Sequence, residues 1–128
     1  MFKTRRKATL YIVLASLTIC ASGCSNSNAA PRVNVSNECQ AAVTAQASIW
    51  MDQTTSDAQV AEADIASLNA CKDLDEWATA VSREPNALGS TGLDVEQAAD
   101  EVHLVCLNDD PNNTSPVCTD AASRGYLE

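Results

Sequence analysis

The residues best suited to chemistry in this chain are its six cysteines and its single histidine, His103. A cysteine thiol can be acylated, oxidised to a disulfide or bound to a metal, depending on its surroundings. A histidine acts as a general base only beside a suitably placed partner. The segments that carry these residues therefore decide which chemistry to expect. The cysteines are Cys20, Cys24, Cys39, Cys71, Cys106 and Cys118.

The segment before Cys24 has the pattern of a secretory signal. Residues 1–7 contain four basic side chains and no acid, and residues 8–21 are almost entirely apolar and small. A basic start, a short apolar run and a small-residue exit are typical of such signals. The apolar run is shorter than the roughly 20 residues that span a bilayer. We predict a signal peptide over residues 1–23. Sec export is favoured over twin-arginine export, because Ala8 is a poor match to the bulky residue expected after Arg5-Arg6.

The stretch Leu17-Thr18-Ile19-Cys20-Ala21-Ser22-Gly23-Cys24 resembles the lipobox of bacterial lipoprotein signal peptides. The resemblance implies that diacylglycerol joins the Cys24 thiol, that cleavage precedes Cys24, and that the new amino terminus can be acylated, for example by palmitate. Cys20 follows the bulky Ile19 and is expected to leave with the signal. Two or more acyl chains make a lasting anchor, since each buried methylene contributes about 0.8 kcal/mol. We expect a lipid anchor in the cell membrane, on its extracytoplasmic face.

The mature chain is small and strongly acidic. Cleavage before Cys24 leaves 105 of the 128 residues, with four basic and all 17 acidic side chains, so the net charge falls from −9 to −13. Such a chain is not expected to bind nucleic acid, which requires a basic surface. The acids are scattered, which is typical of a surface that keeps an exported protein soluble. Only five aromatic residues occur, so a thin core that relies on disulfides is expected.

Apolar spacing of three or four residues predicts helices throughout the mature domain, after a polar, flexible tether over residues 24–36. The expected class is all-α, a small three- to four-helix bundle over residues 37–128. The first helices span 38–53 and 57–71, with Asn37 and Ser56 as N-caps. A shorter helix begins at Asp73 or Asp75 and ends by Pro85. A fourth runs from Asp94 to about Asn108, and a last short helix from Pro116 to Arg124, followed by Gly125.

Certain apolar residues are predicted to face the core because they recur at helical spacing. They are Cys39, Val43, Ala47 and Trp50 in the first helix; Ala61, Ile65 and Leu68 in the second; Leu74, Trp77 and Val81 in the third; and Val95, Val102 and Val105 in the fourth.

Four cysteines remain after the signal is removed, and an even number in an exported domain indicates two disulfides. An antiparallel hairpin brings the start of the first helix next to the end of the second, which predicts Cys39–Cys71. The turn-rich loop after the fourth helix predicts Cys106–Cys118. No C-x-x-C pair occurs and His103 has no second ligand nearby, so we predict no metal site and no cofactor.

Other chemistry is weakly indicated. His103 could be a general base, but Glu96, Asp100 and Asp110 are partners only by nearness, and one histidine specifies no triad. Asp109-Asp110 with Asn112-Asn113 could offer oxygens to calcium, yet the spacing does not fit a calcium loop, and a plain turn is favoured. Trp50 and Trp77 could stack a ligand but are expected in the core. We therefore expect a protein that is not an enzyme.

The pattern Cys71 … Glu76-Trp77 … Pro85 … Cys106 … Pro116-Val117-Cys118 … Ala121 … Gly125 is loosely similar to small helical domains of uncharacterised actinobacterial lipoproteins. The similarity covers roughly residues 37–126 and implies the fold class but no activity. The expected function is a non-enzymatic binding or interaction module of the cell envelope, held by its lipid, with an envelope protein as the candidate partner. The alternative is a phage- or prophage-type exclusion lipoprotein that inhibits an envelope transport or injection protein.

Overall fold

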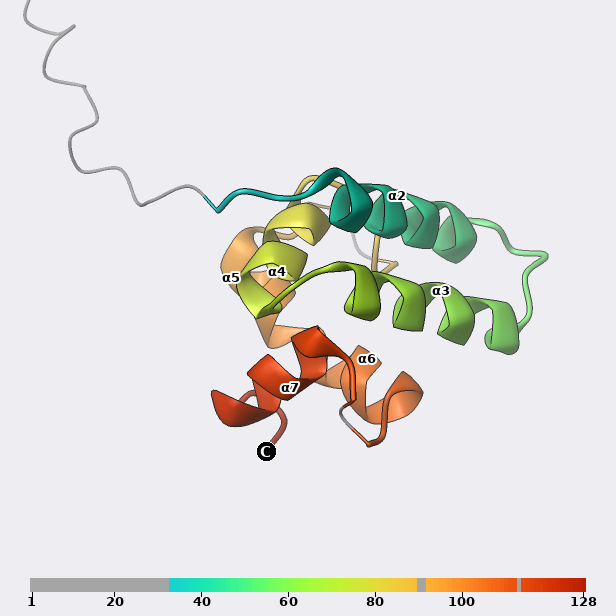
Figure 1. Cartoon of the computed structure of the whole chain (residues 1–128). Coiled ribbons are helices and arrows are strands. Elements are labelled where there is room, and N and C mark those ends of the chain that lie inside the picture. Colours follow the sequence, from blue (N-terminus) through green and yellow to red (C-terminus); the bar gives the residue numbers. More distant parts are fainter. Residues whose placement is uncertain (1–32, 90–91, 113) are drawn as a thin grey trace, which may run out of the picture. The chain divides into compact units, whose positions relative to one another are not determined.

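A computed structural model describes residues 33–89, 92–112 and 114–128, so the expected signal peptide, Cys20, Cys24 and most of the tether lie outside the described residues. The described part is helical without strands, and it contains both expected disulfides, which confirms the all-α class. The helices are α2 (Asn37–Met51), α3 (Asp57–Ala70), α4 (Leu74–Ser82), α5 (Val95–Asp100), α6 (Val102–Asp109) and α7 (Pro116–Ser123) (Figure 1).

Helices α2 and α3 form an antiparallel hairpin along one side of the domain (Figure 1). The N-cap of α2 is Ser36, whose Oγ accepts a hydrogen bond from the Cys39 N–H at 3.2 Å. The expected cap, Asn37, is instead the first helical residue, because the extended backbone that a cap requires occurs one residue earlier. Helix α3 begins as predicted, with a capping box between Ser56 and Gln59.

The fourth predicted helix is interrupted at Glu101, which separates α5 from α6. The Leu104 N–H donates to the Glu101 carbonyl at 3.0 Å, a tighter turn than the α-helical spacing. The carbonyl oxygen of Asp100 lies 2.7 Å from the His103 Nδ1, and it can only accept. A histidine ring that competes with the backbone for this carbonyl favours the break.

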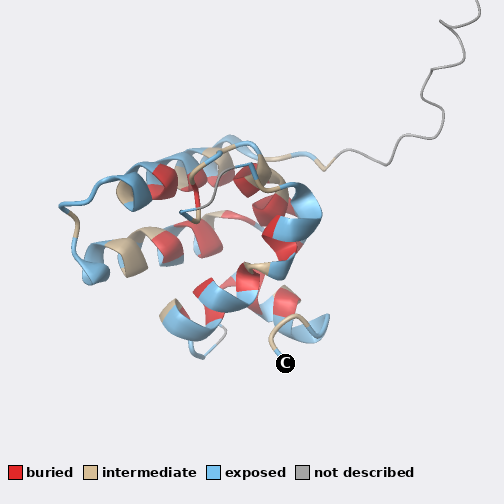
Figure 2. Cartoon of the chain, turned by 180° about the vertical axis from the view of Figure 1, so that it is seen from behind, coloured by how far each residue is buried: buried red, intermediate tan, exposed pale blue. Residues whose placement is uncertain are grey.

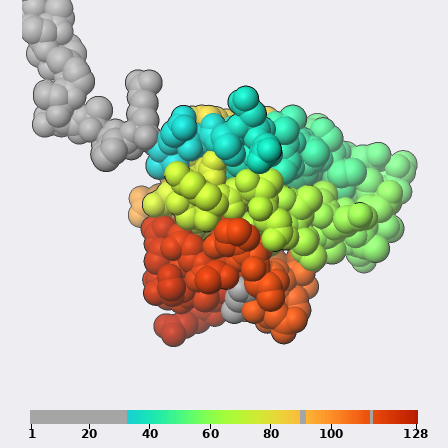
Figure 3. Space-filling model, in the orientation of Figure 1, coloured from blue at the N-terminus to red at the C-terminus, as the bar shows by residue number. Residues whose placement is uncertain are grey.

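Helix α7 and its end follow the prediction. Pro116 is the first helical residue, Arg124 is the C-cap, and Gly125 has a φ of +81°. The Tyr126 N–H donates to the Ala121 carbonyl at 3.0 Å and the Gly125 N–H to the Ala122 carbonyl at 3.2 Å, which together form a Schellman motif. Figure 3 shows α7 stacked beneath α3 and α4, with α2 on the other side of that pair.

Trp77 is fully buried, as the sequence predicts. Figure 2 shows the buried residues on the sides of the helices that face the interior of the domain. Three other residues predicted to face inward are exposed, namely Trp50 at 39%, Ile65 at 37% and Val95 at 43%, and Ala61 is half-buried. The buried face of α3 contains Asp64 in place of the predicted Ile65, so it is shifted by one residue from the predicted face. Val95 is the first residue of α5, and the buried residues of that helix are Ala98 and Ala99.

Both predicted disulfides are present. The Cys39–Cys71 bond joins the start of α2 to the end of α3 with a Cα–Cα distance of 4.6 Å. The Cys106–Cys118 bond joins α6 to α7 across the intervening loop, at 5.6 Å. In the chain-entropy account, loops closed over 32 and 12 residues contribute roughly 3–4 kcal/mol each.

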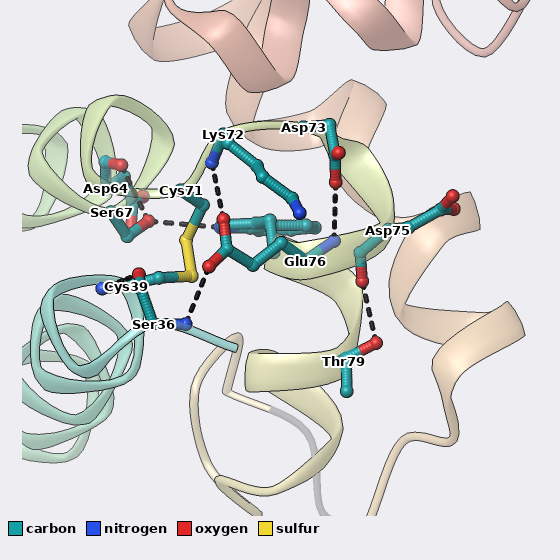
Figure 4. Close-up of a disulfide and its surroundings, with 11 residues drawn as sticks. Ser36, Cys39, Asp64, Ser67, Cys71, Lys72, Asp73, Asp75, Glu76 and Thr79 are labelled. Atoms are coloured by element: carbon teal, nitrogen blue, oxygen red, sulfur yellow. Dashed lines mark hydrogen bonds between the residues drawn. A yellow bond between two sulfur atoms is a disulfide. The ribbon is translucent and has the colours of Figure 1, made fainter. Parts of the chain in front are cut away.

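A buried carboxylate accompanies the first disulfide (Figure 4). The Glu76 Oε1 accepts a hydrogen bond from the Ser36 N–H at 2.7 Å, and its Oε2 accepts one from the Lys72 N–H at 2.6 Å. Burial alone would raise the pKa of Glu76, but these hydrogen bonds outweigh it and hold the pKa below its ordinary value of 4.5. The ionised side chain thus joins the entry of α2 to the turn before α4.

Replacing this carboxylate should weaken the domain. Glu76→Gln places an amide donor opposite one of the two backbone donors. It should lower the free energy of unfolding by about 1.5–3 kcal/mol at pH 7. Because the folded pKa is lowered, the stabilisation by Glu76 is fully present above the unfolded value of about 4.5 and is lost as the pH falls through the folded pKa. Urea unfolding from pH 7 to pH 3 measures this. Glu62→Gln, at an exposed site on α3, is the matched control; equal losses for both variants would contradict the assignment.

Candidate functional site

A cavity of about 270 Å³ lies between the end of α2, helix α3, helix α6 and the loop after α4. Its walls are mostly apolar, and its polar groups gather where α3 meets α6. The residues that line it are Trp50, Val60, Asp64, Leu88, Leu104, Val105, Asn108 and Asp109. The cavity therefore combines an aromatic ring, aliphatic walls and two carboxyl groups.

Asp64 is the most deeply buried acid of the site, with only 2% of its surface exposed. Its Oδ1 accepts hydrogen bonds from the Gln46 Nε2 at 2.6 Å and from the Trp50 Nε1 at 2.9 Å. The Gln46 side chain is itself fully buried, and its Oε1 has no hydrogen-bond partner among the described residues. Since Oδ1 already accepts two hydrogen bonds, a proton on this carboxyl belongs on Oδ2.

Asp109, from α6, lines the same cavity and interacts with the Asp64 carboxyl. Burial is the main cause that raises the pKa of Asp64 from 3.8 to about 7, and Asp109 adds to it. The donors Trp50 and Gln46 act in the opposite sense. Near neutral pH, the Asp64 carboxyl therefore holds a proton for part of the time.

The indole of Trp50 is fixed at two points. Its Nε1 is tied to Asp64, and its six-membered ring lies against the backbone of Gly89. A Cβ at residue 89 would come within 3.2 Å of the Trp50 Cε3, and Gly89 has a φ of +73°. A glycine is therefore needed at this point of the loop, both for space and for backbone conformation.

The site is also connected to the centre of the core. The Ser67 Oγ donates to the Asp64 carbonyl at 2.9 Å, and the Trp77 Nε1 donates to the Ser67 Oγ at 3.1 Å. These bonds connect the turn of α3 that carries Asp64 to the buried Trp77.

The structure does not assemble the histidine site that the sequence allowed. His103 is exposed, and its ring interacts with the main-chain carbonyl of Asp100. Of the possible carboxylate partners, Asp110 is engaged elsewhere and Glu96 is exposed in the first turn of α5. Cys24, the expected lipidation site, lies outside the described residues.

The Asp109-Asp110 pair is divided between two roles. Asp109 lines the cavity, whereas the Asp110 Oδ2 accepts a hydrogen bond from the Ser115 N–H at 2.8 Å and its Oδ1 accepts one from the Thr114 Oγ1 at 2.9 Å. Burial of Asp110 opposes ionisation, but these donors prevail and lower its pKa. The described part of the chain contains no group of three or more His, Cys, Asp or Glu side chains that could hold a metal.

The sequence reasoning missed Asp64 and Gln46. A usable signal was present, because Asp64 lies four residues before Leu68 and Gln46 lies three after Val43, which places both on apolar helix faces. A polar residue on such a face needs a buried partner.

No family model, curated protein or solved structure matches this chain. Among the helices of the described residues, none has the length and apolar character required to cross a bilayer.

Removing the charge of Asp64 should stabilise the domain. Its raised pKa means that the folded state keeps a proton which the unfolded state loses, so stability falls as the pH rises from about 3.8 to about 7. Asp64→Asn keeps an acceptor for Trp50 and Gln46 and offers a donor to Asp109. We expect a gain of roughly 1–3 kcal/mol at pH 8 and little gain at pH 4. Denaturant unfolding at both pH values measures it.

The exposed Asp100→Asn, on α5, is the matched control and should change stability by less than about 0.5 kcal/mol at either pH. A loss of stability in Asp64→Asn at pH 8 would show that the carboxylate itself is required by the fold.

Proposed function

We propose that this protein is an exported lipoprotein, anchored through Cys24 to the extracytoplasmic face of the cell membrane, whose helical domain binds a small ligand without transforming it. The anchor is supported by the signal-like residues 1–23 and the lipobox-like stretch that ends at Cys24. Two disulfides in so small a domain are also what an oxidising, extracytoplasmic compartment favours.

The cavity is the observation that carries the binding role. Concave, mostly apolar sites with a few convergent polar groups are where proteins hold small molecules. This cavity contains such groups in Trp50, Asp64 and Asp109, and the carboxyl of Asp64 is destabilised by its burial. A carboxyl with a strongly raised pKa inside a cavity is a recognised mark of a functional site.

The lining favours binding over catalysis. The described residues around the cavity provide carboxyl, amide and indole groups but no hydroxyl, thiol, imidazole or amine. A carboxyl pair could transfer protons, yet an acyl or phosphoryl transfer also needs donors or cations to stabilise a developing anion. Asn108 is the only side chain of the lining with free amide donor capacity, so a ligand would be held without being activated.

A protein partner is the second candidate, and the exposed apolar side chains of α6 favour it. Leu104 and Leu107 are about half-exposed on this helix. Apolar residues on a surface helix can form the centre of a protein interface. In this form the protein would act on an envelope protein, as an exclusion lipoprotein does.

The anchor is tested at its cysteine. Cys24→Ala should abolish incorporation of an alkyne-labelled fatty acid and move the protein from the detergent phase to the aqueous phase in cells. Cys20→Ala is the matched control, and it should keep both the label and the detergent partition. Labelled, detergent-bound Cys24→Ala protein would place the anchor elsewhere.

The cavity is tested with a neutral probe. Benzyl alcohol should shift the indole N–H resonance of Trp50 in a ¹⁵N NMR titration and leave that of the buried Trp77 nearly unchanged. Val60→Phe, which fills the cavity from α3, should weaken this binding at least about tenfold. Equal binding by both proteins would mean that the probe binds another part of the domain, which would contradict the proposed site.

A further inference from the structure

We infer that the cavity beside Trp50, Asp64 and Asp109 selects a small organic cation, with an ammonium head at the carboxyl pair and a ring or short alkyl body against the aliphatic walls. This inference rests on the proposed binding function and names the chemical class of its ligand.

The electrostatics of the cavity favour a positive head group. Asp64 of α3 and Asp109 of α6 both line the cavity, and no basic side chain is among the described residues of the lining. Arg124 is held by Asp75 and Asp120, at 3.1 Å each, and so is engaged outside the lining. An ammonium group beside these carboxyls would supply a positive charge that the described lining lacks, and would form charge-assisted hydrogen bonds.

The ring of Trp50 adds a second attraction for a cation. Its N–H is already used by Asp64, so the indole contributes to the cavity through its ring. A cation is attracted to an aromatic face, more strongly when the site is desolvated than when it is exposed. Trp50 is 39% exposed, which places it between these cases.

The remaining walls require an apolar body on the ligand. Val60, Leu88, Leu104 and Val105 form these walls, and the volume is about 270 Å³. An apolar cavity of about 150 Å³ accommodates benzene. A phenyl ring or short alkyl chain with an amine head therefore fits.

Inorganic cations and anions match the cavity less well. A calcium ion takes six to eight oxygen ligands, whereas the described lining offers two carboxyls and one amide in an apolar setting. An anion would meet two carboxyl groups in a protein whose net charge is −9 before any cleavage, without a basic partner in the lining.

The test compares three probes of one shape and different charge: benzylamine, benzyl alcohol and benzoate. Each is titrated into the ¹⁵N-labelled protein at pH 8 and at pH 5.5, and the dissociation constant is taken from the Trp50 indole shift. At pH 8 benzylamine should bind at least about tenfold more tightly than benzyl alcohol, as one desolvated ion pair would give. Benzoate should bind more weakly than the alcohol.

The pH dependence tests the role of the carboxyl pair. Protonation of Asp64 at pH 5.5 competes with the ammonium group, so the advantage of benzylamine should fall severalfold while benzyl alcohol binding stays constant. The titratable group that faces Asp64 is Asp109 from α6, and the groups that face it from α2 are the non-titrating Gln46 and Trp50.

Variants distinguish the inference from the binding function on which it rests. The double variant Asp64→Asn/Asp109→Asn should bring benzylamine within about twofold of benzyl alcohol, whereas Asp100→Asn should keep the full preference. Equal binding of amine and alcohol by the native protein, or an unchanged preference in the double variant, would overturn the cation assignment and leave the cavity as a binding site. Failure of all three probes to shift Trp50 would contradict the binding function itself.

Discussion

Each of the two disulfides of this domain is accompanied by a buried carboxylate that accepts hydrogen bonds from main-chain N–H groups. These carboxylates stabilise the contacts between helices. Glu76 does so next to Cys39–Cys71, and Asp110 does so next to Cys106–Cys118. The core between them is built largely from alanine, valine and cysteine around one tryptophan. Small side chains bury little area each, so a domain of this size gains less from the hydrophobic effect than its chain entropy requires. The two disulfides and the hydrogen bonds of the buried carboxylates add stability at the places where helices meet.

The Cys39–Cys71 bond and Glu76 lie at one end of the α2–α3 hairpin. Further along the hairpin the helices carry a polar group, with Asp64 between Gln46 and Trp50, and a cavity in place of a filled core. Burying an acid against another acid lowers stability. A fold that tolerates this arrangement is stabilised elsewhere, and such local inconsistencies are where function is expected.

Much of the fold could be predicted because its signals are local. The caps at Ser56 and Asp73, the glycine after α7 and both cysteine pairs depend on residues close in sequence or on hairpin geometry. The errors arose where two local signals compete. Ser36 and Asn37 are both good caps, and only the tertiary hydrogen bond from the Ser36 N–H to Glu76 favours the first. The break at Glu101 depends on a histidine ring reaching a carbonyl, which apolar spacing does not encode.

The candidate site could not be predicted in the same way, because its parts come from four segments that local patterns do not relate. The environment of Trp50 includes Gly89, and that of Asp64 includes Asp109, and both neighbours are distant in the sequence. In the folded domain, Asp64 and Asp109 would link the free energy of unfolding to the occupancy of the cavity by the proposed cation. A bound cation removes the like-charge repulsion that opposes folding when both acids are ionised, so a ligand of that class would stabilise the domain most at the pH where the empty site weakens it most. With the proposed ligand, binding and folding would depend on the same two carboxyl groups.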